Sequence, residues 1–419
     1  MPGTLRIAIR RFDPFTTAIR RQFERFQAET GCQLRLEAES FELTDLYETL
    51  FTSRGLKEGA WDVAFVVTDW MADAVAQGAL LDLAPRMDSL PIPGYPDAWA
   101  PALTRFQRFG EAVYGVPYHD GPECLVYRRD LFADEGERAA FAARHGRPLE
   151  VPRSWEAFTE TARFFTRPAD GLFGTIFAAY PDGHNSVYDF CLQLWSRGGD
   201  LTDATGAPTL DTPPAVAALD AYRRAVNDRA LTPPGQEAID SVASGERFAG
   251  GSIAMMVNWF GFAAACEQPG CPTKGKVDVA PPPAGEDGRP ASLNVYWLLA
   301  VGAGSRHPDE AYAFLRHVCS PAMDKITMLE GGIGCRRSTW EDPEVNAVIP
   351  FANRLAELHE HARELPRSPD LPRLVHVLDR AVQRAITTDD PTATILREAQ
   401  AEASPIRLGP PAAGKAGPG

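Results

Sequence analysis

YGVPYHDGPECLVYRRDLF, from Tyr114 to Phe132, joins two short hydrophobic runs through a segment controlled by glycine and proline. The runs, residues 112–116 and 124–127, have the length of strands. We interpret the stretch as a crossing between strands of two different sheets, because glycine permits unusual backbone angles and proline fixes its own. An ordinary strand, turn and strand within one domain is the alternative. The crossing would display three side chains, Tyr118, His119 and Asp120.

Length and composition indicate a folded protein of two domains. The chain has 419 residues, of which 44% are hydrophobic and 23% charged, so each of two domains can bury its own core. No apolar run approaches the roughly 20 residues of a membrane helix. The net charge of -14 argues against a nucleic-acid partner, because binding phosphates requires a basic surface.

The first seventy residues predict an α/β layer architecture. Strands are expected at residues 5–9, 33–38 and 63–67, with helices at 14–30 and 43–56 between them. The valine-rich run at 63–67 is typical of a strand buried on both faces, as in a parallel sheet. In such sheets ligands bind outside the carboxyl ends of the strands. Here those ends are Arg11–Phe15, Ser40–Phe41 and Thr68–Trp70.

Beyond the crossing, helical and strand patterns continue. Further helices are predicted at 153–166, 188–196, 215–228, 308–320, 322–329, from 355 onward and at 371–385, and strands at 173–177, 253–257 and 293–301. The tail at 405–419 is rich in proline and glycine, and we expect it to be disordered.

Seven cysteines are scattered along the chain, mostly in apolar surroundings. We interpret most of them as small core residues. Cys266 and Cys271 are close enough in sequence for a local disulfide, and the sequence leaves their state open. No CxxC motif is present, so we expect no metal site.

Three stretches together resemble one protein family. They are YGVPYHDGPECLVYRRDLF, GERFAGGSIAMMVNW at residues 245–259 and GGIGCRRSTWEDPEV at residues 331–345. In this order they resemble motifs of the family 1 extracellular solute-binding proteins, the sugar-binding components of ABC importers that include maltose-binding protein. The resemblance covers roughly residues 4 to 400.

The resemblance implies an α/β fold of the two-lobed type II periplasmic-binding-protein class. Each lobe would be a sheet flanked by helices, with the ligand cleft between the lobes. The N-terminal lobe would comprise residues 1–117 and 298–336, and the C-terminal lobe residues 118–297 and 337–404. The protein would be a monomer without a cofactor, which binds a sugar, oligosaccharide or polyol and delivers it to the transmembrane subunits of an ABC permease at the membrane periphery.

The candidate ligand-binding residues combine aromatic and polar side chains. A sugar offers hydroxyl groups and an apolar ring face, so its site needs hydrogen-bond partners and an aromatic platform. Trp70, Trp259 and Trp297 are the predicted platforms, with Asp69 and Asn258 as hydrogen-bond partners; core packing is the alternative for each tryptophan. The other candidates are Arg11, Phe12, Asp13, Ser40, Phe41, Tyr118, His119, Asp120, Trp195, Tyr296, Gly332 and Arg336.

Several candidates have a second interpretation. His119 and Asp120 could bind hydroxyl groups or brace the hinge, and Arg11 could be a surface charge. The glycines around Gly332 could lend backbone N–H groups to a ligand or only stop a helix. Arg336 could contact the cleft or an acidic partner.

Two other functions remain open at this stage. A carbohydrate-active enzyme is one, although no GxSxG, P-loop or HExxH motif is present. An intracellular two-lobed solute sensor is the other, because the N-terminus lacks a visible secretory signal. The resemblance favours the periplasm or the cell surface; the sequence does not identify the solute or its charge.

Overall fold

The computed structural model describes residues 3–285 and 290–408, and the chain divides into two compact units. Unit 1 comprises the residues up to Gly121 together with Val295–Ala356. Unit 2 comprises Pro122–Asn294 and the residues from Glu357 onward. The first passage from one unit to the other therefore falls within the stretch Tyr114–Phe132.

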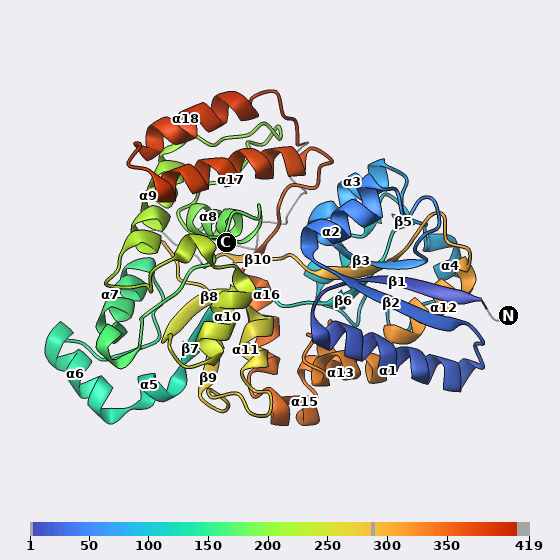
Figure 1. Ribbon diagram of the computed structural model, residues 1–419, viewed down its shortest axis with the longest axis horizontal. Helices are drawn as coiled ribbons and strands as arrows, with labels where there is room; N and C mark the ends of the chain where they lie inside the picture. The colour runs from blue at the N-terminus through green and yellow to red at the C-terminus, as the bar shows by residue number, and fades with distance from the viewer. Residues whose placement is uncertain (1–2, 286–289, 409–419) are drawn as a thin grey trace. The chain divides into compact units, whose positions relative to one another are not determined.

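Unit 1 is built on a five-stranded sheet in the order β2-β1-β3-β11-β6 (Figure 1). Its strands are β1 (Thr4–Arg10), β2 (Arg35–Phe41), β3 (Val63–Val67), β6 (Val116–His119) and β11 (Trp297–Val301). β1 pairs in parallel with β2 and β3, whereas β11 runs antiparallel to β3 and β6. All five residues of β3 are buried, which confirms the sequence pattern of a strand covered on both faces.

Helices cover both faces of this sheet. Helix α1 (Asp13–Thr30) lies on one face with α12 (Pro308–Val318) and α13 (Pro321–Leu329), and α2 (Leu43–Tyr47) and α3 (Met71–Ala76) lie on the other (Figure 1). Helix α1 starts with a proline in its first turn and ends at Gly31, whose φ of 71° is left-handed. Unit 1 also contains α4 (Ala84–Ser89), β4 (Arg108–Phe109), β5 (Ala112–Val113), α14 (Arg337–Trp340) and α15 (Pro343–Val348).

Unit 2 contains a three-stranded antiparallel sheet in the order β8-β7-β9. Its strands are β7 (Glu123–Arg128), β8 (Met255–Trp259) and β9 (Val277–Ala280). A second, parallel pair joins β10 (Ser292–Leu293) to β12 (Ala362–Arg363). The helices are α5 (Arg129–Ala133), α6 (Glu135–His145), α7 (Trp155–Phe165), α8 (Asn185–Trp195), α9 (Pro213–Asn227), α10 (Ser241–Ala249), α11 (Phe260–Ala265), α17 (Leu371–Thr387) and α18 (Thr392–Ala403), while α16 (Leu355–Glu360) begins at the unit boundary.

Helix α8 is the centre of unit 2. All eleven of its residues are buried, and it packs against α9 and α17. Figure 1 shows α8 below α17, with α9 beside it. A helix buried all round holds polar side chains only where they have a structural or binding role.

Three predicted elements differ in the structure. Residues 173–177 form no strand but a single bridge, Phe173 with Ile253, because the backbone there bonds instead to Leu231 and to the Gln236 side chain. The predicted helix 43–56 stops at Tyr47 and continues as one π-helical segment, Glu48–Thr52. The predicted strand 293–301 is divided between β10 and β11, so it spans the boundary between the units.

The third boundary lies further along the chain than predicted. The structure groups residues 337–356 with unit 1, whereas the sequence prediction placed them in the other lobe. The reason is the buried carboxylate of Asp324 in α13, which accepts hydrogen bonds from the backbone of Cys335 and Arg336 and from the Thr339 hydroxyl group. These bonds hold α14 onto unit 1.

The beginning of the expected disordered tail is placed in the structure. Ile406 and Leu408 are buried, and the Leu408 N–H donates to the carbonyl oxygen of Gly206 at 3.1 Å. Residues 409–419 lie outside the described part of the chain.

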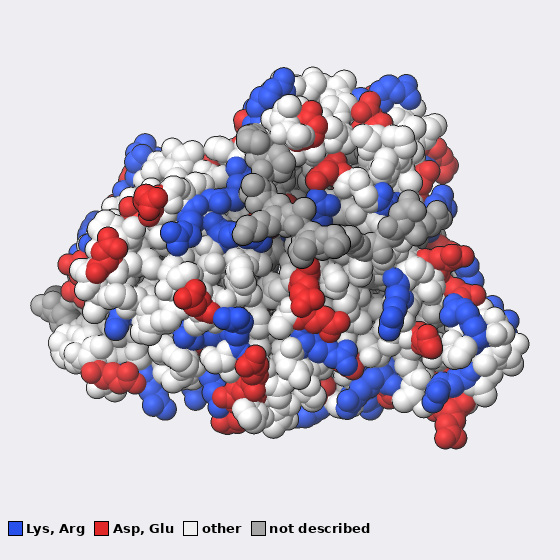
Figure 2. Space-filling model, turned by 180° about the vertical axis from the view of Figure 1, so that it is seen from behind, with Lys and Arg blue, Asp and Glu red and all other residues white. Residues whose placement is uncertain are grey.

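All seven cysteines are free thiols in this structure, including Cys266 and Cys271. Among the described residues, none of the helices has both the length and the hydropathy needed to cross a bilayer. On the face shown in Figure 2, acidic and basic side chains are interspersed.

Candidate functional site

The strand ends of unit 1 meet at one edge of its sheet. Trp297, the first residue of β11, pairs with Val67 at the end of β3 and with His119 at the end of β6. Arg10 and Phe41, the last residues of β1 and β2, pair with each other. This register brings the predicted residues that follow β1, β2, β3 and β6 to the same edge, which we call the unit 1 edge.

Two tryptophans lie at the unit 1 edge in different settings. Trp297 is half-buried, whereas Trp70 is only 6% exposed. The ring of Trp70 packs edge-on against Trp297, with centroids 5.9 Å apart, and against Tyr47 at 5.3 Å. Trp297 therefore keeps an accessible part that can stack on a solute, and Trp70 supports it from the interior. Asp69 is half-buried in the 3₁₀ turn Thr68–Trp70 beside them.

His119 is fixed in one tautomer. Its Nδ1 atom accepts a hydrogen bond from the Ile333 N–H at 2.8 Å, and the Asp120 N–H donates to the Ile333 carbonyl oxygen at 3.0 Å. Burial lowers the pKa of His119 to about 4, although the nearby Asp120 carboxylate acts in the opposite direction. The imidazole is therefore neutral near pH 7, and the pairing with Ile333 holds it at the unit 1 edge.

The residues after β1 occupy the start of helix α1. Arg11 and Asp13 are exposed, and Arg11 lies 3.3 Å from the Glu42 carboxylate. Phe12 is the N-cap residue of α1, and its half-buried ring packs against Phe15 with centroids 5.0 Å apart. An exposed ion pair of this kind contributes little stability, so Arg11 fits the alternative interpretation as a surface charge.

Ser40 and Phe41 at the end of β2 are half-buried. The Ser40 hydroxyl group is hydrogen-bonded to that of Thr16 at 2.9 Å. The Phe41 ring packs edge-on against Trp61, with centroids 5.5 Å apart. Both side chains thus have protein partners and still keep an exposed part.

Two predicted ligand contacts lie in the interior of unit 1. Tyr118 and Tyr296 are 2% and 1% exposed. The Tyr118 hydroxyl group donates to Gln22 at 3.1 Å, and that of Tyr296 donates to Gln107 at 3.0 Å. Each phenol satisfies its polar group inside unit 1, which fits interior packing, and solute contact by either residue stays a prediction.

Arg336 and Gly332 also make their contacts inside unit 1. The Arg336 guanidinium donates to the Cys319 carbonyl oxygen at 2.8 Å and lies 4.5 Å from the centre of the Trp99 ring. The Gly332 N–H donates to the Thr327 carbonyl oxygen at the end of α13. A Cβ atom at Gly332 would lie 2.8 Å from the Thr327 side chain, so glycine is needed there for close packing.

In unit 2, the pair Asn258-Trp259 ends strand β8. Asn258 is 4% exposed; its amide donates to Ser241 and Ser244, and its oxygen accepts from the Trp259 N–H. Asn258 therefore ties β8 to α10 in this structure, and its role as a ligand partner stays a prediction. Trp259 itself is half-buried and remains a candidate platform.

The start of helix α8 faces Trp259. The Trp259 indole N–H donates to the Asn185 side-chain oxygen at 3.3 Å, and the Tyr188 ring packs edge-on against the indole with centroids 5.8 Å apart. Asp182 accepts the His184 and Asn185 N–H groups and so orders the first turn. We call Trp259 and the α8 residues around it the unit 2 face.

Two carboxyl groups are buried at the unit 2 face. Glu123, at the start of β7, is 2% exposed and pairs in register with Trp259; Asp189 of α8 is 9% exposed and accepts a hydrogen bond from the Tyr222 hydroxyl group at 3.1 Å. Burial raises the pKa of Asp189 to about 8. Burial also raises the pKa of Glu123 well above its usual range, and the Asp189 charge adds to this effect.

Trp195 at the end of α8 is not part of this face. It is 5% exposed, and the Arg363 guanidinium lies 5.1 Å from the centre of its ring. Its buried indole N–H has no hydrogen-bond partner among residues 3–285 and 290–408. Core packing therefore accounts for the ring, and solute contact by Trp195 stays a prediction.

Sequence reasoning missed Asn185, Tyr188, Asp189 and Glu123. Asn185 and Asp189 are four residues apart on one helix, so they share a face, and this spacing was a usable signal. Glu123 stands inside the quoted stretch Tyr114–Phe132, but its polarity in an otherwise hydrophobic strand received no weight.

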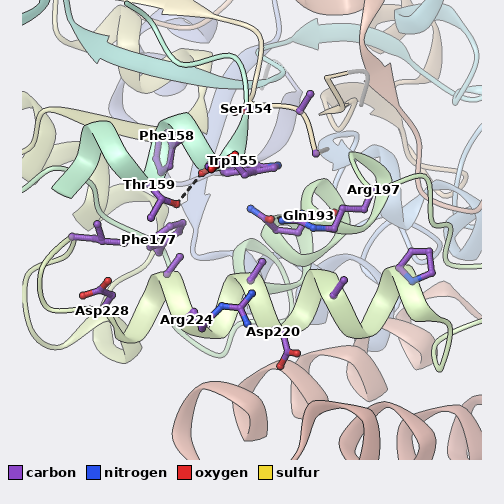
Figure 3. A pocket seen from close by; sticks show the side chains of 18 of the residues that line it. Ser154, Trp155, Phe158, Thr159, Phe177, Gln193, Arg197, Asp220, Arg224 and Asp228 are labelled. Carbon is purple, nitrogen blue, oxygen red and sulfur yellow. Dashed lines mark hydrogen bonds between the residues drawn. The ribbon is translucent and has the colours of Figure 1, made fainter. Parts of the chain in front are cut away.

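A surface pocket of about 980 Å³ lies elsewhere in unit 2, between α7, the end of α8 and α9 (Figure 3). Within it the Thr159 hydroxyl group donates to the Trp155 carbonyl oxygen at 2.8 Å, and the Trp155 indole N–H donates to Ser196 at 3.0 Å. None of the predicted ligand-binding residues lines this pocket. Over the described residues, no group of three or more His, Cys, Asp and Glu side chains could hold a metal ion.

Comparison with known proteins supplies the family. The profile of bacterial extracellular solute-binding proteins matches residues 13–325. The chain belongs to this family. The family consists of binding proteins rather than enzymes, and its extracellular character indicates the periplasm or the cell surface.

Relatives and solved structures agree with this assignment. The "Probable ABC transporter-binding protein" of Deinococcus radiodurans is 27% identical over 313 residues, which cover 71% of this chain and 69% of that protein. The "Probable amino-acid ABC transporter periplasmic-binding protein" of Sinorhizobium fredii is 24% identical over 258 residues, 61% of this chain and 55% of that protein.

Solved structures of similar shape establish the fold. Maltose-bound MalE3 of T. maritima is 23% identical with a TM-score of 0.83, covering 96% of this chain and 99% of that one. A ribitol complex from Agrobacterium radiobacter K84 is 24% identical with a TM-score of 0.84, covering 97% and 100%. The chain therefore has the two-lobed type II fold of periplasmic binding proteins, as the sequence predicted.

Proposed function

We propose that this protein captures a sugar, oligosaccharide or polyol outside the cytoplasm and delivers it to the permease subunits of an ABC importer. One observation carries the proposal. Each unit has a half-buried tryptophan at the terminus of a sheet strand among hydrogen-bonding side chains, Trp297 at the start of β11 and Trp259 at the end of β8. An indole face with polar neighbours suits the C–H patch and the hydroxyl groups of a carbohydrate.

The relatives support the same class of solute. Family members of this fold have been solved with maltose, ribitol and D-mannitol, and the relative in Deinococcus radiodurans is named as an ABC transporter-binding protein. We propose that the protein acts as a monomer, peripheral to the membrane, and returns its solute chemically unchanged. The remaining solute contacts in this proposal are Phe12, Phe41, Asp69, His119 and Asp120 in unit 1 and Asn185 and Tyr188 in unit 2.

A thermal-shift screen over sugars, polyols and sugar acids tests the proposal. A solute that binds only the folded protein raises the free energy of unfolding by mass action, by about 2.7 kcal/mol at a concentration one hundred times the dissociation constant, and so raises the melting temperature. We expect stabilisation by at least one neutral or amine-bearing carbohydrate or polyol. Stabilisation by amino acids alone would favour the function named for the Sinorhizobium fredii relative and contradict the carbohydrate proposal.

A turnover assay addresses catalysis. The solute found in the screen is incubated with the protein at a stoichiometric ratio and recovered after several hours. We expect the recovered solute to be intact by mass and chromatography. Hydrolysis or rearrangement that disappears with Trp259→Ala would contradict the assignment as a binding protein.

A further inference from the structure

The buried carboxyl pair of unit 2 indicates the charge of the solute. Glu123 and Asp189 lie at the face that carries Trp259, and each is more than nine-tenths buried. We propose that this pair binds a protonated amine, so that the solute is an amino sugar or an amino polyol. This inference rests on the proposed function, because it specifies the solute of the same site.

Three elements bring the relevant side chains together. Glu123 of β7 stands directly opposite Trp259 of β8, and directly paired residues of antiparallel strands point to the same face of the sheet with Cβ atoms about 5 Å apart. Asn185 of α8 bonds to the Trp259 indole, and Asp189 follows it by one helical turn. The two carboxyl groups therefore adjoin the ring proposed as the platform.

Glu123 lacks the partners that buried carboxylates normally have, whereas Asp189 has the Tyr222 hydroxyl group as a donor. Glu123 Oε2 is buried without a hydrogen-bond partner among the described residues. In that same part of the chain, neither Glu123 nor Asp189 forms a salt bridge with lysine, arginine or histidine. Buried polar groups are nearly always paired, so the unpartnered oxygen points to a ligand atom.

Among the described residues, no positively charged side chain is paired with either carboxyl group. The titratable groups that interact with them are Tyr222 of α9 and Cys124 of β7, and Asp182 before α8 in turn interacts with Tyr222; all are neutral or acidic. Two neighbouring carboxylates in a buried site cannot both ionise at low cost, so one proton remains on the pair near neutral pH. A bound cation can take the place of that proton.

An ammonium group fits this position better than a hydroxyl group. It has three N–H donors, enough to reach both carboxylates, and its hydrogen bonds to them are charge-assisted. A hydroxyl group supplies one donor and leaves the charge of the pair unchanged, whereas an acidic solute is repelled.

Isothermal titration calorimetry with matched solutes tests the inference at pH 7. The pairs are D-sorbitol with 1-amino-1-deoxy-D-sorbitol, and D-glucose with D-glucosamine. We expect the amine of the better-binding pair to bind at least about tenfold more tightly than its hydroxyl counterpart, as a charge-assisted hydrogen bond exceeds a neutral one. Repeating the titration in two buffers of different ionisation enthalpy should show proton release on binding of the amine only.

Substitutions assign the effect to the pair. Glu123→Gln should abolish the preference for the amine, whereas Glu246→Gln, at an exposed position on α10, should retain it. Asp189→Asn serves as the second variant and should give the same loss, with folding of each variant checked by its thermal melt.

The possible outcomes distinguish failure of this inference from failure of the proposed function. Equal affinity for each amine and its hydroxyl counterpart, or a preference that survives both substitutions, overturns the inference and leaves the proposed function intact. Absence of binding by every compound, together with an empty thermal-shift screen, contradicts the proposed function itself.

Discussion

The two units treat a buried carboxyl group in opposite ways. In unit 1, Asp324 is 5% exposed and accepts hydrogen bonds from the Cys335 and Arg336 N–H groups, at 2.8 and 3.1 Å, and from the Thr339 hydroxyl group. In unit 2, Glu123 is buried to the same degree with one oxygen unpartnered among the described residues. A buried carboxylate whose oxygens all accept hydrogen bonds from the protein, as in Asp324, has a structural role. A buried carboxylate oxygen without a protein donor, as in Glu123, indicates a place for a ligand atom.

The largest expected effect comes from removing the satisfied carboxylate. Asp324→Ala leaves three buried donors without an acceptor, so we expect a loss of roughly 3 kcal/mol of unfolding free energy in unit 1. Chemical denaturation followed by tryptophan fluorescence measures the loss, with Asp97→Ala at an exposed position as the control. A loss no greater than that of the control would show that the network contributes nothing.

Substitution of Asp189 in the unit 2 pair should instead raise the free energy of unfolding at pH 8. Asp189 has a pKa of about 8 in the folded protein, above its unfolded value, so its contribution to stability is fully present below about pH 4 and is lost as the pH rises toward 8. Asp189→Asn removes this loss and should stabilise the protein by roughly 1 to 3 kcal/mol at pH 8. Thermal melts of both proteins at pH 5 and pH 8 measure the difference, and a variant less stable than the wild type at pH 8 would contradict it.

The half-buried indole of Trp259 tests the unit 2 face as a binding surface. Trp259→Ala removes the platform of unit 2 and should weaken solute binding at least about tenfold, about 1.4 kcal/mol, without unfolding the protein. Calorimetry with the solute from the thermal-shift screen measures the change. Trp195→Phe, in the same helix-packed region but under Arg363, is the matched control and should leave the affinity unchanged.

The smallest effect is expected at a residue that the sequence assigned to the site. Tyr296→Phe removes the hydroxyl group that bonds to Gln107, which should cost about 1 kcal/mol of stability and nothing in affinity. A loss of affinity without a loss of stability would restore Tyr296 as a solute contact.

The same comparison explains what the sequence could predict. The parallel strands β1, β2 and β3 of unit 1 alternate with helices, and their carboxyl ends fall at one edge by a general rule, so the position of Phe41 and Asp69 at that edge could be inferred. Trp297 begins the antiparallel strand β11, so the rule does not cover it. The sheet of unit 2 is antiparallel and short, and no such rule locates its binding face. Glu123 and Asp189 become neighbours only through the packing of α8, which the sequence does not specify.

The burial of individual aromatic side chains is the other property that the sequence does not predict. Tyr118, Tyr296 and Trp195 stand beside polar residues at strand or helix ends, as Trp259 and Trp297 do. Whether such a ring stays accessible depends on a partner far away in the chain, such as Gln22 for Tyr118 or Arg363 for Trp195. Residue type and spacing therefore indicate candidate side chains without distinguishing surface from interior.

The hydrogen bond between the Ile333 N–H and His119 has one more consequence. Since Nδ1 is occupied as an acceptor, the ring proton resides on Nε2, and the low pKa keeps the ring neutral at pH values well above 4. Acidification of the surroundings thus does not turn this side chain into a cation that would compete with an incoming one. Its Nε2–H group acts only as a hydrogen-bond donor, which suits the lone pairs of an alcohol or ether oxygen.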